Sequence, residues 1–254
     1  MKPFKFCIYF FILIIICGCK ESKQTLQETI VSSGPKIKLE QVVRLSKSPK
    51  SNPPLLILLH GRGSNENDLF NPLESYIDSS FVIVSLRAPI TLRQDSYSWY
   101  PIKFTDKGLV IDKSDEAKAV TLVYETIKEL IKTYKVDKEQ VYLMGFSQGA
   151  ILSSAIIMKH PELISGAVIL SGGIPKSVKT PIDQPKLYSK AKIFMSHGKK
   201  DDVLSIDDAR ILNVTMKNWG IENLTYVEHD GGHTLDNEHL NLLLHWLSSN
   251  INNG

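Results

Sequence analysis

Cysteine is scarce in this 254-residue sequence, which contains three, and all of them lie within the first nineteen residues. Three cysteines grouped at one end cannot form a disulfide framework for a domain of this length. Charge of one sign is also lacking, because 30 basic and 27 acidic residues give a formal net charge of +3. A nucleic-acid-binding protein usually shows a clustered basic face, so this near balance predicts that nucleic acid is not a partner.

Long apolar runs and internal repeats are missing as well. The longest apolar run covers residues 6–17, and as a helix it would rise about 18 Å, well short of the roughly 30 Å hydrocarbon core of a bilayer. Hydrophobic residues make up 43% of the chain and charged residues 22%. These fractions are typical of soluble globular proteins, and they exclude wholesale disorder, collagen-like repeats and polytopic membrane architecture.

The N-terminus has the pattern of an export signal. Lys2 and Lys5 accompany the apolar run, and small residues follow it, as in a secretory signal peptide. Residues 16–19, Ile-Cys-Gly-Cys, resemble a bacterial lipobox, in which the last cysteine receives a lipid. We therefore predict a signal peptide over residues 1–18 and an exported lipoprotein of the bacterial cell envelope, periplasmic or outer-membrane anchored. Its lipidated Cys19 attaches a flexible tether, residues 19–36, to the membrane. The alternative is a plain signal peptide or a short uncleaved anchor.

Residues 37–254 are predicted to form one domain of alternating strands and helices. The continuous apolar runs at 55–60 and 81–85 are typical of strands covered on both faces. Residues 37–45 alternate like an edge strand, and residues 115–134 carry apolar side chains at helical spacing. Further strands are expected at 140–146, 166–170, 192–196 and 224–228, and further helices at 148–159, 205–219 and 237–247. This alternation predicts an α/β fold with a mostly parallel central sheet and helices on both faces.

The clearest motif is Gly-Phe-Ser-Gln-Gly at residues 145–149. It follows a predicted strand and opens a predicted helix, which is the context of a nucleophile elbow. Glycines at both ends would let the strand and the helix approach closely, and the helix dipole would favour an oxyanion beside its N-terminus. The motif therefore predicts Ser147 as a nucleophile.

A serine nucleophile needs a base that is held by an acid, and in this fold the chain order is Ser, then Asp or Glu, then His. His233 ends an Asp-Gly-Gly-His loop between a strand and a helix, so it is favoured over His229 at the strand end. The acid is expected just after the strand at 192–196, where either Asp201 or Asp202 could reach the imidazole. His197 is interpreted as a packed residue at the strand end.

A second turn should face the elbow. His-Gly-Arg-Gly at residues 60–63 follows the strand at 55–59, and it would present the backbone amide of Arg62 toward Ser147. The amides of Arg62 and Gln148 are then the expected oxyanion hole. The Arg62 side chain could also reach an anionic group, although most arginines on loops are simply solvated.

Six segments now occur in an order that resembles a known family. They are residues 58–70, Arg-Ala-Pro at 87–89, Ser-Tyr-Ser-Trp-Tyr at 96–100, Gly-Phe-Ser-Gln-Gly-Ala at 145–150, His-Gly-Lys-Lys-Asp at 197–201 and Gly-Gly-His at 231–233. Together they resemble the phospholipase/carboxylesterase family of the α/β-hydrolases, which includes acyl-protein thioesterases. The resemblance covers about residues 37–247.

The resemblance implies hydrolysis of carboxylic esters without a metal or cofactor, in a fold with little or no lid. It places the catalytic acid at Asp201 and Trp99 at the acyl pocket, and we take Gly61 and Leu69 as further substrate-binding residues. The expected substrate is a small-molecule or glycan-linked ester. The alternatives are thioesterase or lysophospholipase activity on the same triad, a peptidase, and a non-catalytic lipoprotein that binds an envelope partner. The sequence gives no indication of oligomeric state.

Overall fold

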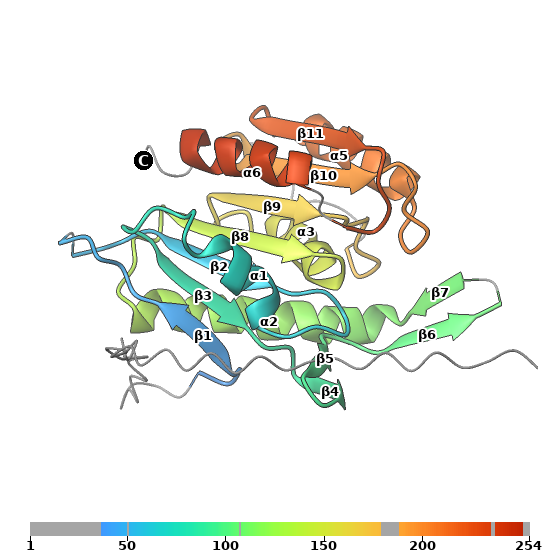
Figure 1. Cartoon of the computed structure of the whole chain (residues 1–254), viewed down its shortest axis with the longest axis horizontal. Coiled ribbons are helices and arrows are strands. Elements are labelled where there is room, and N and C mark those ends of the chain that lie inside the picture. The colour runs from blue at the N-terminus through green and yellow to red at the C-terminus, as the bar shows by residue number, and fades with distance from the viewer. Residues whose placement is uncertain (1–36, 50, 107, 179–187, 235–236, 251–254) are drawn as a thin grey trace, which may run out of the picture. The chain divides into compact units, whose positions relative to one another are not determined.

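The computed structural model describes residues 37–49, 51–106, 108–178, 188–234 and 237–250 (Figure 1). The predicted signal peptide, the lipidation site at Cys19 and the tether lie outside the described residues. Within the described ranges, no helix is both long enough and apolar enough to cross a membrane.

A seven-stranded sheet forms the centre of the described fold. All neighbouring strands pair in parallel except β1, which pairs antiparallel with β3. Strand β1 lies at one edge, as the alternating pattern at residues 37–45 predicts. From that edge the order is β1 (Gln41–Arg44), β3 (Val82–Leu86), β2 (Leu55–Leu59), β8 (Val141–Phe146), β9 (Gly166–Leu170), β10 (Lys192–Gly198) and β11 (Leu224–His229). The prediction of an α/β fold with a mostly parallel sheet is confirmed.

Helices cover both faces of this sheet, and the sheet separates the core into two clusters (Figure 1). One face packs against α2 (Lys113–Thr133), α3 (Gln148–Lys159) and α5 (Ile206–Asn218), and the other against α1 (Asn67–Leu73) and α6 (Asn237–Asn250). Strand β2 shows the consequence, because Leu55, Ile57 and Leu59 belong to the first core while Leu56 and Leu58 belong to the second. A strand buried on both faces must be apolar at every position, which explains the unbroken run in the sequence.

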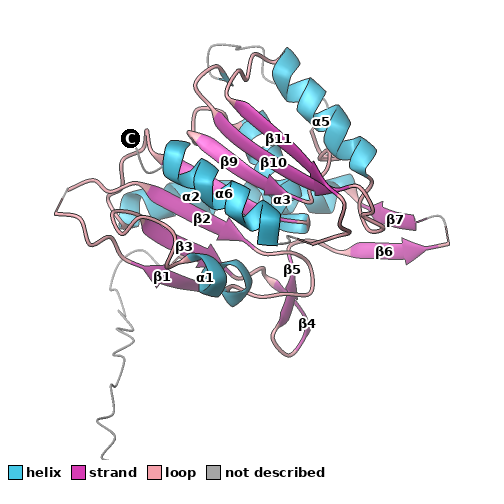
Figure 2. Cartoon of the chain, turned by 45° about the horizontal axis from the view of Figure 1, so that its top comes forward, coloured by secondary structure: helices cyan, strands magenta, loops and turns pink. Residues whose placement is uncertain are grey.

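Three local features were not predicted. Two hairpins, β4 (Ile90–Arg93) with β5 (Ser96–Ser98) and β6 (Ile102–Thr105) with β7 (Gly108–Ile111), stand outside the central sheet (Figure 2). Their strands are three or four residues long and partly exposed, so none carries an apolar run long enough to predict a buried strand. Helix α1 has seven residues and contains Pro72, so it is too short to show a helical period.

The carboxyl ends of the parallel strands meet at one edge of the sheet, where the strand arrows of Figure 2 point. The loops that follow β2, β8, β10 and β11 all start there, and they carry the predicted site residues Arg62, Ser147, Asp201 and His233. Open parallel sheets place their ligand sites at this edge. The fold alone thus collects residues that are 171 positions apart in the chain.

Candidate active site

Ser147 lies on a sharp turn between β8 and α3. Its backbone has φ 52° and ψ −114°, a combination that residues with a side chain rarely adopt. A Cβ atom at position 145 would lie 2.3 Å from the carbonyl oxygen of Gly149, and one at position 149 would lie 2.0 Å from the carbonyl oxygen of Leu59. Neither contact is sterically possible, so the turn requires glycine on both sides of the motif.

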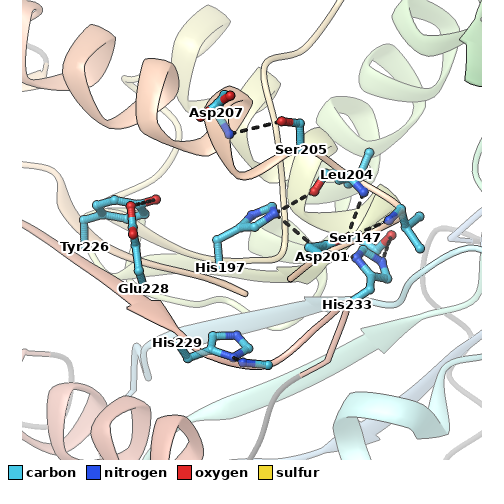
Figure 3. A network of polar contacts seen from close by, with 12 residues as sticks. Ser147, His197, Asp201, Leu204, Ser205, Asp207, Tyr226, Glu228, His229 and His233 are labelled. Carbon is cyan, nitrogen blue, oxygen red and sulfur yellow. Dashed lines mark hydrogen bonds and ion pairs between the residues drawn. The ribbon is translucent and has the colours of Figure 1, made fainter. Parts of the chain in front are cut away.

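Three predicted residues form a continuous chain of hydrogen bonds (Figure 3). The Ser147 Oγ atom lies 2.8 Å from Nε2 of His233, and Nδ1 of the same ring lies 2.7 Å from Oδ2 of Asp201. The Asp201 carboxylate is fully buried, and its Oδ1 accepts hydrogen bonds from the amides of Val203 and Leu204, each at 2.9 Å. The structure therefore brings Ser147, Asp201 and His233 together, while Asp202 is exposed.

The loop that carries His233 packs backbone against backbone on the end of β10. A Cβ atom at Gly198 would lie 2.2 Å from the carbonyl oxygen of Gly232, so this crossing also requires glycine. The amide of Gly231 donates to Nδ1 of His229 at 3.3 Å. His229, the alternative base, is buried at the strand end, and this hydrogen bond holds the loop in place.

A second histidine contacts the triad acid. Nε2 of His197 lies 3.2 Å from Oδ2 of Asp201 and 3.0 Å from the carbonyl oxygen of Leu204 (Figure 3). His197 is 1% exposed, as expected of a packed strand-end residue, but its contact with Asp201 was not foreseen. Its Nδ1 atom is buried and has no hydrogen-bond partner among the described residues, so the ring makes these polar contacts through Nε2.

The turn at residues 60–63 lies directly beside the nucleophile. A Cβ atom at Gly61 would lie 3.4 Å from Cβ of Ser147 and 2.9 Å from the Phe146 ring. Gln148 is the first residue of α3, so its amide has no acceptor within the helix. Within the described ranges, the amides of Arg62 and Gln148 donate to no protein acceptor. Both are therefore available to an oxyanion that forms at Ser147.

His60 anchors the start of this turn. Its ring is fully buried, its Nδ1 lies 2.7 Å from the carbonyl oxygen of Gly61, and its Nε2 accepts a hydrogen bond from the amide of Ala88 at 3.1 Å. Burial lowers the pKa of His60 from its ordinary value of 6.5, so the ring is neutral and carries its proton on Nδ1. The indole Nε1 of Trp99 donates to the carbonyl oxygen of His60 at 2.9 Å, which fixes the turn from the other side.

The Gln148 side chain ties the neighbouring loop to the elbow. Its Oε1 accepts hydrogen bonds from the Trp99 amide at 2.8 Å and the Ser98 hydroxyl at 3.2 Å, and its Nε2 donates to the carbonyl oxygen of Tyr100 at 2.8 Å. The residue is 2% exposed. The sequence predicted a role for its amide alone, because nothing local indicates which loop its side chain meets.

An apolar cavity of about 250 Å³ opens beside Ser147 and His233. The β6–β7 hairpin forms one wall, because Ile102 lies opposite Ile111 and Phe104 lies opposite Leu109, which places all four side chains on one face. The lining is completed by Arg62, Tyr100, Gln148, Ile151, Val203 and Leu204. Among the described residues, no group of three or more His, Cys, Asp or Glu side chains is placed to hold a metal ion.

Three expected substrate-binding residues lie elsewhere. Trp99 is 2% exposed and packs in the core, and the adjacent Tyr100 lines the cavity instead. Leu69 belongs to the unpredicted helix α1, whose apolar side chains pack against the sheet. Gly61 does not line the cavity, and a side chain there would meet Ser147 and the Phe146 ring. The sequence signal for the cavity wall is a pair of apolar residues two positions apart in each strand, at 102 and 104 and at 109 and 111.

Comparisons with known proteins agree with this geometry. The phospholipase/carboxylesterase family model matches residues 40–251. Acyl-protein thioesterase 1 of Candida albicans is 25% identical over 216 residues, which cover 78% of this chain and 92% of that protein. Carboxylesterase SOBER1 of Arabidopsis thaliana is 26% identical over 145 residues, covering 57% and 63%. The crystal structure of the Bacillus cereus carboxylesterase gives a TM-score of 0.72 at 24% identity, covering 84% of this chain and 94% of that one. The chain therefore belongs to the phospholipase/carboxylesterase family, and it is a serine hydrolase that acts on carboxylic ester bonds.

Proposed function

We propose that this protein hydrolyses small carboxylic esters at the bacterial cell envelope through an acyl-enzyme intermediate. The observation that carries the proposal is the hydrogen-bonded series Asp201, His233 and Ser147 at the edge of an apolar cavity. The cavity, at about 250 Å³, lies below the roughly 300–1,000 Å³ of typical ligand pockets. This size favours a short acyl group over a long lipid chain.

In the proposed reaction, Ser147 Oγ attacks the ester carbonyl carbon while Nε2 of His233 takes the hydroxyl proton. Asp201 holds the ring through Nδ1 and stabilises the imidazolium, and the amides of Arg62 and Gln148 donate to the oxyanion. As the bond to the leaving alkoxide breaks, His233 returns its proton to that oxygen, and the acyl group stays on Ser147. Water then attacks the acyl group with His233 as base, which releases the acid and restores the serine.

Turnover of p-nitrophenyl butyrate and labelling by a fluorophosphonate probe test this mechanism together. Ser147→Ala should lose both while its circular dichroism spectrum stays unchanged. Asp201→Ala should lower kcat by about 10³–10⁴-fold, whereas the matched variant of the exposed neighbour, Asp202→Ala, should keep it. Turnover retained in Ser147→Ala would rule out Ser147 as the nucleophile, and absent labelling of the wild type would favour a non-catalytic lipoprotein.

A thioesterase acting on the same triad is the second candidate, because the matched relatives include an acyl-protein thioesterase. Phenyl butyrate and S-phenyl thiobutyrate present the same acyl group on oxygen or sulfur, so their kcat/KM ratio separates the two activities. We expect the oxygen ester to be preferred. A panel that varies acyl length and includes acetylated xylan tests the glycan-linked esters that an envelope location would supply. No preference for glycan esters in that panel would count against them.

The envelope location depends on lipidation of Cys19, and the nearby Cys17 provides a matched control. Labelling of cells with an alkyne fatty acid should mark the wild type and Cys17→Ala, since Cys17 would leave with the signal peptide. Cys19→Ala should lose the label. A Cys19→Ala protein that keeps the label would overturn the assignment of the lipidated residue.

A further inference from the structure

One permanently charged side chain, Arg62, lines the catalytic cavity, and none of the described lining residues is acidic. Arg62 is exposed and forms no ion pair within the described part of the chain. Two other arginines of this fold behave differently, because Arg87 binds Glu66 through two nitrogens and Arg210 binds Glu228 in the same way. Arg62 therefore lines the cavity without an anionic partner among the described residues.

The Arg62 guanidinium is nevertheless held in a defined place. Its central carbon lies 5.0 Å from the centroid of the Phe104 ring, which stands on β6 and is itself 66% exposed. An arginine stacked on an aromatic face is ordered by the ring, while its planar edge of N–H groups stays free for hydrogen bonds. Stacking on Phe104 thus fixes the cation at the wall of the cavity and leaves its donors unused.

The backbone of the same residue relates this cation to the reacting carbonyl. The Arg62 amide is the proposed oxyanion donor beside Ser147, and its side chain runs from there to the β6–β7 hairpin. An ester whose carbonyl oxygen sits at the oxyanion hole would therefore extend along this side chain. We propose that the natural substrate carries a second, anionic oxygen group, a carboxylate or phosphate, which the Arg62 guanidinium binds. This inference rests on the esterase function proposed above.

The contact between Arg62 and an anionic group should be stronger than an ordinary surface ion pair. Exposed pairs are weak because water screens them and because two flexible side chains must be ordered. Here Phe104 has already ordered the cation, and the apolar side chains of Ile102 and Leu109 border the same cavity. A guanidinium fork matches two oxygens of a carboxylate or phosphate, and such charge-assisted hydrogen bonds correspond to about a tenfold gain in kcat/KM.

Two pairs of substrates separate the anionic group from the ester chemistry. Mono-4-nitrophenyl adipate and methyl 4-nitrophenyl adipate differ in one charge on the acyl side. The butyrate esters of 4-hydroxybenzoate and of 4-hydroxybenzamide differ in one charge on the alcohol side. The measured quantity is the ratio of kcat/KM for the anionic ester over its neutral partner, in the wild type, Arg62→Met and Arg93→Met. Arg93 is an exposed arginine on β4 that does not line the cavity, so it provides the matched control.

The ratio is used because the Arg62 charge also favours the oxyanion of every ester, so absolute rates can fall for neutral substrates as well. In one of the two pairs, the ratio should fall about tenfold in Arg62→Met and should stay at the wild-type value in Arg93→Met. The pair that responds identifies the side of the ester that carries the charge. Raising the salt concentration should shrink the wild-type ratio and leave the Arg62→Met ratio nearly unchanged.

Equal ratios in the wild type and Arg62→Met for both pairs would overturn the inference, as would an equal fall in Arg93→Met. Either result would leave the esterase function standing if the neutral esters are hydrolysed by the wild type. Failure of the wild type to hydrolyse any of the four esters would instead remove the proposed function itself.

Discussion

His197 Nε2 lies 3.2 Å from Oδ2 of Asp201, the same oxygen that lies 2.7 Å from Nδ1 of His233. The carboxylate therefore contacts two imidazole rings at one oxygen and two backbone amides at the other. A buried carboxylate held from four sides cannot rotate freely. Its orientation sets the orientation of the His233 ring, on which proton transfer from Ser147 depends.

Replacing His197 should therefore weaken catalysis without removing a group that touches the substrate. We expect His197→Ala to lower kcat for p-nitrophenyl butyrate by about tenfold, since one hydrogen bond to a charged group is lost. His197→Gln can still donate an N–H from a similar position, so it should recover most of the rate. Equal kcat values for His197→Ala and His197→Gln would show that the hydrogen-bond donor does not contribute to catalysis.

Backbone strain at Ser147 makes a prediction about stability. The φ of 52° and ψ of −114° cost on the order of 1–3 kcal/mol for a residue with a Cβ atom, and glycine escapes this cost at an entropic price of about 0.5–1 kcal/mol. Ser147→Gly should therefore unfold with a free energy about 1 kcal/mol higher than that of Ser147→Ala, measured by urea denaturation. Both variants are inactive, so the comparison isolates strain. A less stable glycine variant would contradict the strained geometry.

The glycine at position 149 should be irreplaceable. An alanine Cβ there would lie 2.0 Å from the carbonyl oxygen of Leu59, so α3 would have to move away from β2. We expect Gly149→Ala to lower the free energy of unfolding by about 3 kcal/mol or more and to lose activity, because the Gln148 amide moves with the helix. At Gly173 the nearest atom would lie 3.5 Å away, and Gly173→Ala should stay within about 0.5 kcal/mol of the wild type. Equal stability of the two variants would argue against the close approach.

Burial of neutral His60 should make folding sensitive to pH. The unfolded chain protonates this ring as the pH falls below 6.5, whereas burial lowers the pKa of His60 in the folded protein. Below pH 6.5 the unfolded state then binds more protons, so stability falls with pH until the folded pKa is passed. His60→Gln keeps an acceptor for the Ala88 amide and removes the titration. Between pH 7.5 and pH 5, it should lose less unfolding free energy than the wild type, and an equal loss in both proteins would contradict this reading.

Much of the fold followed from local pattern. The run at residues 55–59 had to be a strand covered on both faces, because alternate leucine and isoleucine side chains enter two different cores. The β6–β7 hairpin was missed for the opposite reason, since both strands are only four residues long and Lys103 interrupts the apolar residues of β6. Short exposed strands depend on tertiary contacts around the cavity, and the neighbouring sequence does not show those contacts.

The sequence by itself determined the order along the chain of the central strands and the longer helices, the parallel sheet and the nucleophile elbow. These depend on local periodicity, on two glycines and on the rule that parallel strands end at one edge. Spacing alone left Asp201 and Asp202 open, and in the tertiary structure it is the Asp201 carboxylate that meets His233. Only the tertiary structure showed that Tyr100 rather than Trp99 lines the cavity, that His197 contacts Asp201, and that Arg62 stacks on Phe104. These contacts join loops that are distant in the chain, and side-chain direction at the ends of strands is decided by the neighbours that folding brings there.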